Sequence, residues 1–179
     1  MSSKKKLNLG KKSEVTLNIY LDTTNSEKPV VLMPEEEAVL DLKNLPENIT
    51  VISSTWKRPN WMLQQVIELN AYIDKLVNGR VQRFFDMNAL AQARIKVLLL
   101  DWSMTEHDVS WALEFEPCAD AMDLKVLSMK CMRKIGEIDP PTILATMYAK
   151  MYAEFYSEGS PAVQNFLKEK LEKEAQSKA

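Results

Sequence analysis

The residues that could do nucleophilic chemistry in this sequence are its single histidine, His107, and its two cysteines, Cys118 and Cys131. A cysteine beside a histidine can act as a nucleophile, because the imidazole takes up the thiol proton. Cys118 follows His107 by eleven positions, but neither segment carries a recognisable nucleophile elbow. His107 stands between Glu106 and Asp108 on a polar stretch, which is typical of a solvated histidine. We therefore expect inert, buried thiols and no Cys–His catalytic pair.

Metal and phosphate sites are not indicated either. One histidine and two cysteines are too few soft ligands for a zinc site. The four glycines are too dispersed to form a glycine-rich phosphate loop. The carboxylates have no spacing that requires a metal or an acid–base pair; those that we considered are Asp101, Asp108 and Asp123. We expect no cofactor, no metal and no enzymatic activity.

The stretch STWKRPNW, residues 54–61, places two tryptophans around a pair of cations and a proline. The proline biases the residue before it toward extended backbone and Asn60 is a good N-cap, so the stretch predicts the joint between a strand and a helix. Trp56 and Trp61 could then pack across that joint while the two cations point outward. Two other uses stay open, a clamp for single-stranded nucleic acid and a protein-docking edge.

A stripe of methionine and tyrosine at helical spacing marks residues 147–156. Its members are Met147, Tyr148, Met151, Tyr152, Phe155 and Tyr156. Core packing is one interpretation, because methionine fills irregular gaps and tyrosine can keep its hydroxyl at the rim. A docking face is the other, because tyrosine and methionine are enriched at interfaces and a Met-rich surface can repack against several partners.

The charge balance gives no global reason to expect a polyanionic partner, because the formal net charge is -2 and the pI is about 5.6. The basic N-terminus is not followed by a continuous apolar segment, so it does not resemble a signal peptide. The longest apolar run, residues 97–100, is far shorter than the roughly 18 residues that a membrane span needs. We expect a soluble protein with no membrane partner, in a reducing cytoplasm.

The N-terminal region predicts a small antiparallel sheet. Apolar and polar residues alternate over 15–21, which is the period of a half-buried strand. A polar tip then leads into residues 29–34, whose two prolines restrict this second hairpin strand to a sheet edge. Two short apolar runs follow at 39–42 and 49–52. A sheet of three or four strands would account for residues 15–54.

The rest of the chain predicts helices, because it is poor in glycine and rich in Met, Leu, Ala, Lys and Glu. Apolar residues at spacings of three and four run from Met62 to Leu76, and Asn78-Gly79 supplies a stop signal. Residues 103–120 have no clear period and predict a long connection. The other expected helices are a central one over about 86–102 and three more over 121–135, about 140–157 and from 160 onward.

Together these elements predict an α+β protein, with a small N-terminal antiparallel β-sheet followed by a C-terminal bundle of about five helices. The expected organisation is a flexible basic arm over residues 1–13, a small β-rich subdomain over 14–55, a helical bundle over 56–159 and an exposed charged C-terminal helix over 160–179.

The run RIKVLLLDWSM, residues 94–104, ends the expected central helix. In this run, and in the order of its parts, the chain resembles assembly and structural proteins of tailed bacteriophages, most of all tail assembly chaperones. In these, an arginine-led helix often ends in a leucine-rich run and a D-W or S-W step. The tail assembly chaperones commonly continue into a turn with Gly or Pro, whereas this chain has Ser103 to Glu106. The matching residues are Arg94, Leu98, Leu99, Leu100, Asp101 and Trp102, with Trp56 and Pro59 as a weaker upstream match.

The resemblance implies a non-enzymatic bacteriophage morphogenesis protein that acts through protein–protein contacts, as a tail assembly chaperone or a structural component of the virion. Its partners would be other phage structural proteins, such as tail proteins, or further copies of itself, in the host cytoplasm or the virion. The residues expected to contact protein are Trp56, Trp61, Trp102, Met147, Tyr148, Met151, Tyr152 and Tyr156. The alternative is a nucleic-acid-associated phage protein; its contacts would be Lys4, Lys5, Lys6, Lys57 and Arg58.

Overall fold

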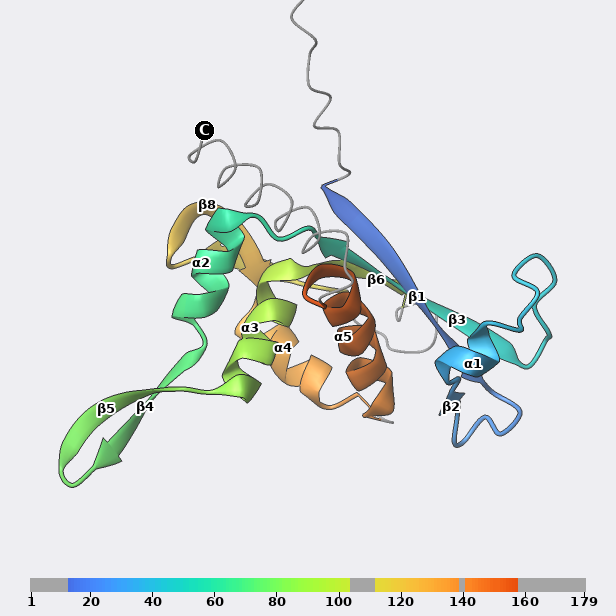
Figure 1. Ribbon diagram of the computed structural model, residues 1–179, viewed down its shortest axis with the longest axis horizontal. Coiled ribbons are helices and arrows are strands. Elements are labelled where there is room, and N and C mark those ends of the chain that lie inside the picture. Colours follow the sequence, from blue (N-terminus) through green and yellow to red (C-terminus); the bar gives the residue numbers. More distant parts are fainter. Residues whose placement is uncertain (1–12, 104–111, 139–140, 158–179) are drawn as a thin grey trace, which may run out of the picture.

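A computed structural model describes residues 13–103, 112–138 and 141–157, and Figure 1 shows how their elements are arranged. The largest sheet is antiparallel, with the strand order β2-β1-β3-β6. Its strands are β1 (Glu14–Asp22), β2 (Val30–Val31), β3 (Ile49–Lys57) and β6 (Leu99–Trp102). The alternating pattern of β1 turns Ile19 and Leu21 into the core, as its sequence predicts.

Of the four segments predicted to form the N-terminal sheet, the first, second and fourth contain the strands β1, β2 and β3, and the third does not. β2 lies at the sheet edge between Pro29 and Pro34, where missing N–H donors are tolerated. The apolar run 39–42 forms no strand; it follows the short helix α1 (Pro34–Glu37) in turns. The fourth strand is β6, which reaches β3 from beyond residue 98 and pairs with it across a bulge.

Two further hairpins lie in the C-terminal region, where helices and a long connection were expected and no strands. The first joins β4 (Tyr72–Val77) to β5 (Arg80–Phe85), and the second joins β7 (Phe115–Cys118) to β8 (Ala121–Leu127). Asn78 and Gly79 both have positive φ, 51° and 73°, as a type I′ hairpin turn requires. The Asn-Gly pair is therefore a turn between strands and not the end of a long helix.

Three of the four remaining helices begin at a side-chain cap. The four are α2 (Trp61–Leu69), α3 (Met87–Leu98), α4 (Met129–Gly136) and α5 (Thr142–Phe155). Asn60, Asp86 and Ser128 each accept a hydrogen bond from a backbone N–H of the first turn, from Leu63, Ala89 and Cys131 respectively. The predicted starts of α2 and α3 are confirmed by these caps, whereas the cap at Ser128 was not predicted.

The C-terminal bundle of about five helices is wrong. The described residues form eight strands in three sheets and five short helices. The helix expected over 62–76 ends at Leu69, and the one expected over 121–135 is β8 followed by α4. β3 also continues to Lys57, two residues beyond the expected end of the β-rich subdomain at residue 55. The basic arm and the C-terminal charged helix lie outside the described residues.

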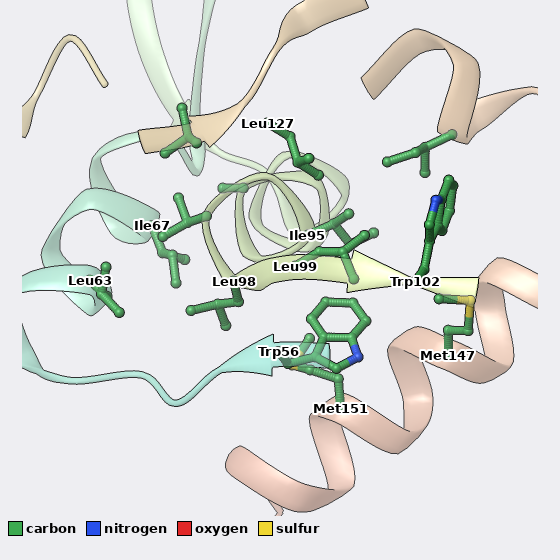
Figure 2. Close-up of a cluster of buried hydrophobic side chains, with 14 of the residues drawn as sticks. Trp56, Leu63, Ile67, Ile95, Leu98, Leu99, Trp102, Leu127, Met147 and Met151 are labelled. Carbon is green, nitrogen blue, oxygen red and sulfur yellow. The ribbon is translucent and has the colours of Figure 1, made fainter. Parts of the chain in front are cut away.

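A continuous apolar core joins the sheet to the helices. α2 packs on α3, α3 packs on β8 and β3, and α5 crosses β1 and β2. Figure 2 shows Trp56, Leu98 and Leu99 at the centre, with Met147 and Met151 reaching in from α5. The β4–β5 hairpin leaves this core and projects from one end of the molecule (Figure 1).

Candidate protein-binding surfaces

Trp56 and Trp102, expected at an interface, are core residues. Trp56 is fully buried, and its indole Nε1 donates to Ser54 Oγ at 2.8 Å. Ser54 Oγ in turn lies 3.3 Å from the backbone oxygen of Leu17 on the neighbouring strand. Trp102 is 4% exposed on β6, and Figure 2 shows it in the same apolar cluster. A buried indole needs such a hydrogen-bond partner, so Trp56 is placed to fill and orient the core.

Trp61 has the opposite environment. It is the first residue of α2 and is 78% exposed, directly after the Asn60 cap. The expected packing of Trp61 with Trp56 across the joint is therefore wrong. STWKRPNW is a strand-to-helix joint, as predicted, and it sends one tryptophan into the core and the other into solvent.

The cations of this joint are less available than their sequence suggests. Lys57 is half-buried at the end of β3, opposite Glu14. Arg58 Nη2 lies 3.4 Å from Glu154 Oε1, and its guanidinium carbon lies 5.5 Å from the centre of the Phe155 ring. Arg58 thus ties the joint to α5 instead of pointing outward. Lys4, Lys5 and Lys6 lie outside the described residues.

The Met/Tyr stripe of α5 divides into two faces. Met147 and Met151 are buried, so for them core packing is the correct interpretation. Tyr148 and Tyr156 are half-buried and Tyr152 is exposed. The tyrosines therefore lie at the rim of the core, where they surround a residue from α3.

That residue is Arg94, which is 8% exposed and has no ion-pair partner among the described residues. Its guanidinium carbon lies 4.0 Å from the centre of the Tyr156 ring and 5.3 Å from that of Tyr152. Its Nη1 donates to Tyr148 Oη at 3.0 Å. The positive charge is held by aromatic faces and one phenol, which is a cation–π arrangement. This cluster fixes α5 on α3 and was not predicted from the sequence.

The phenol of Tyr156 is largely shielded from water and is hydrogen-bonded. Its hydroxyl donates to Gln64 Oε1 at 3.0 Å, and desolvation raises the pKa of Tyr156 to about 12, although the nearby Arg94 charge acts in the opposite direction. The phenol is therefore neutral at physiological pH. It acts here as a hydrogen-bond donor that links α5 to α2.

The β4–β5 hairpin carries the most exposed apolar pairs that face one another. Opposite residues of an antiparallel pair share a face, and the register sets Tyr72 against Phe85 and Leu76 against Val81. Leu76 and Val81 are 74% and 71% exposed, and the Tyr72 and Phe85 rings meet edge to face at 5.6 Å. We call Tyr72, Leu76, Val81 and Phe85 the hairpin patch.

Among the residues that the structure describes, few lie over this patch. At its base the N–H of Asp86 donates to the carbonyl oxygen of Ala71, which closes the two strands. Between the two apolar pairs, Arg83 Nε lies 3.4 Å from Asp74 Oδ1. An isolated two-stranded ribbon is marginally stable in water. An apolar face on such a ribbon is most stable when a partner covers it.

Two of the residues considered for catalysis are buried, and two lie outside the described residues. Cys118 and Cys131 are both buried free thiols, and His107 and Asp108 lie outside the described residues. Within the described ranges no three His, Cys, Asp or Glu side chains are grouped in a way that could hold a metal ion. The helices of those ranges include none with the length and apolar character to cross a membrane.

Comparisons with known proteins identify no relative. No family model, no curated protein and no solved structure matches the chain. No relative therefore indicates a function for the chain.

Proposed function

We propose that this protein works by binding other proteins, not by catalysis, and that the β4–β5 hairpin is its main contact arm. The observation that carries the proposal is the hairpin patch, in which two apolar cross-strand pairs face solvent on an arm that projects from the body (Figure 1). Exposed apolar side chains gathered on one face are typical of interaction sites.

The energetics favour a covered hairpin. Fully burying an exposed Leu, Val or Phe side chain contributes about 1.5–3 kcal/mol, so covering the patch, and above all Leu76 and Val81, favours binding and offsets part of the cost of association. Two of the four patch residues are aromatic, and aromatic residues are enriched at the centres of interfaces. Ordering the ribbon on a partner would also stabilise the arm itself.

The setting that we propose is bacteriophage morphogenesis, as a tail assembly chaperone or as a structural component of the virion, in the host cytoplasm or the particle. The resemblance of residues 94–102, with Trp56 and Pro59 upstream, supports this setting. In the structure Arg94, Leu98, Leu99 and Trp102 pack in the core. They would form a scaffold, while the hairpin makes the contact with other phage structural proteins.

Substitutions in the patch test the proposal. Leu76→Asp combined with Val81→Asp should abolish co-purification with candidate tail proteins, with affinity falling at least about tenfold because two apolar side chains are lost from the contact. Met122→Asp is the matched control, because Met122 is also a strongly exposed apolar residue, at 94%, on a different hairpin. If the Leu76/Val81 variant and the Met122 variant retain the same partners, the hairpin is not the contact arm.

A further inference from the structure

The segment at the end of the molecule opposite the hairpin is acidic, although Lys150 of α5 is paired with one of its carboxylates, Glu37. Residues 22–48 contain seven carboxylates and two lysines, which gives them a net charge of −5. Figure 1 places this segment, with α1 and β2, at one end of the longest axis and the β4–β5 hairpin at the other. The carboxylates are those of Asp22, Glu27, Glu35, Glu36, Glu37, Asp41 and Glu47.

An apolar groove opens at the same acidic end. It has a volume of about 640 Å³ and lies between residues 29–34 and the first half of α5. The α5 side of the groove is lined by small residues, Thr142, Ala145, Thr146 and Ala149, and Val30 and Met33 are exposed on the opposite side. Pro34 lines the groove and is followed directly by the exposed Glu35, so a carboxylate lies close to the groove.

The hairpin has the complementary character. It carries three cations, Lys75, Arg80 and Arg83, against the single carboxylate of Asp74, for a net charge of +2 over residues 72–85. The apolar Leu76 and Val81 form the second cross-strand pair from the turn, and Lys75 and Arg80 lie beside them on the other face of the ribbon. The arm therefore combines apolar side chains with positive charge, and the groove combines an apolar lining with carboxylates in the neighbouring segment.

We propose that the hairpin of one copy docks into the acidic-end groove of a second copy of the same chain. The inference rests on the proposed function, because it names the partner of the same arm. The two surfaces lie at opposite ends of one molecule, so a chain cannot fill its own groove with its own hairpin. Such a contact joins unlike surfaces; it closes as an antiparallel pair or a ring, or continues as a filament.

A charge exchange tests this docking. The hairpin variant carries Lys75→Glu and Arg80→Glu, which keeps the Asp74–Arg83 pair, and the groove variant carries Glu27→Lys and Glu35→Lys; all four positions are exposed. Solution mass by light scattering after size exclusion should give a multiple of the 20.5 kDa chain for the unaltered protein. Each variant should shift toward 20.5 kDa, with a dissociation constant raised at least about tenfold.

The chain that carries all four substitutions provides the decisive arm, because it restores opposite charges across the contact. It should recover the mass of the unaltered protein, and circular dichroism should show that every variant stays folded. An unaltered chain whose mass stays at 20.5 kDa at all concentrations overturns the inference. So does an assembly whose mass is unchanged by either pair of substitutions, or one that the combined substitutions do not restore. In each of these cases the Leu76/Val81 co-purification experiment still decides separately whether the hairpin binds another protein.

Discussion

The methionine face of α5 and the hairpin patch are both apolar, but the chain covers only one of them. Met147 and Met151 lie on a helix that crosses the sheet, and both are buried. Leu76 and Val81 lie on a ribbon that leaves the body, and both are exposed. The comparison shows that residue type alone does not distinguish core from contact surface. The element that carries the residues, and where that element points, makes the difference.

The largest effect that we expect separates the two tryptophans of STWKRPNW. Trp56→Ala should lower the free energy of unfolding by about 3–5 kcal/mol, because it removes a fully buried indole and leaves a cavity. Trp61→Ala should change it by no more than about 0.5 kcal/mol, because that indole is exposed. Urea unfolding followed by circular dichroism measures both values. Equal losses would contradict the division of this stretch into a core residue and a surface residue.

The comparison between α5 and the hairpin is tested directly by two truncations. Met151→Ala should cost about 2–5 kcal/mol of stability, since Met151 is fully buried. Leu76→Ala should leave stability nearly unchanged in the isolated chain and weaken partner binding instead. Thermal unfolding and a binding titration on the same two variants measure both properties. A Leu76 variant as unstable as the Met151 variant would place the hairpin patch in the core.

The tyrosine rim of α5 should give the fold a pH dependence in alkali. The pKa of Tyr156 is raised to about 12, so the folded state holds the phenol proton more tightly than the unfolded state, whose pKa is near 10. Its contribution, on the order of 2 kcal/mol, is complete below pH 10 and is lost as the pH rises from 10 to 12. Ultraviolet titration should show one late tyrosine that Tyr156→Phe removes. A titration unchanged by Tyr156→Phe would show that Tyr156 is not the buried phenol.

A smaller and more local effect is expected at the hairpin turn. Gly79 has φ of 73°, which an L-residue with a side chain adopts only with strain, so Gly79→Ala should cost about 1 kcal/mol. The cost should appear as faster hydrogen exchange of the amides in residues 72–85, with little change in the exchange of α3 or β3. Gly136→Ala is the control, since Gly136 is helical and nothing lies near an added Cβ. Equal effects of the two changes would argue against a type I′ turn.

The sequence predicts those parts of the fold in which one local signal dominates. Strict alternation identifies β1, and Asn60 and Asp86 are strong caps that locate α2 and α3. The hairpin was missed because Asn-Gly is both a helix stop and a type I′ turn signal, and Ile73 and Leu76 happen to continue the helical spacing. In the structure β4 pairs with β5 over six residues, so Asn-Gly is a hairpin turn. The residue spacing within one segment cannot reveal that pairing.

The candidate surfaces were predictable to a smaller extent. Trp61 and Tyr152 are exposed, as a contact role requires, but Trp56, Trp102, Met147 and Met151 are buried. Tryptophan and methionine are common both in cores and at interfaces, so the residue type could not distinguish a core position from an interface position. The Arg94 cluster depends on α3 meeting α5, which is a tertiary contact without a local sequence signal.

The most direct test of the contact-arm proposal is photo-crosslinking from the hairpin patch while the protein is produced in cells. A photoreactive residue at position 81 should form covalent adducts with a protein, either a second copy of the chain or a different protein. The same residue at position 122, which is also strongly exposed, should form few. Adducts from position 81 that clearly exceed those from 122 are the predicted result. Adducts no more frequent at 81 than at 122 would contradict the claim that the hairpin is the contact arm.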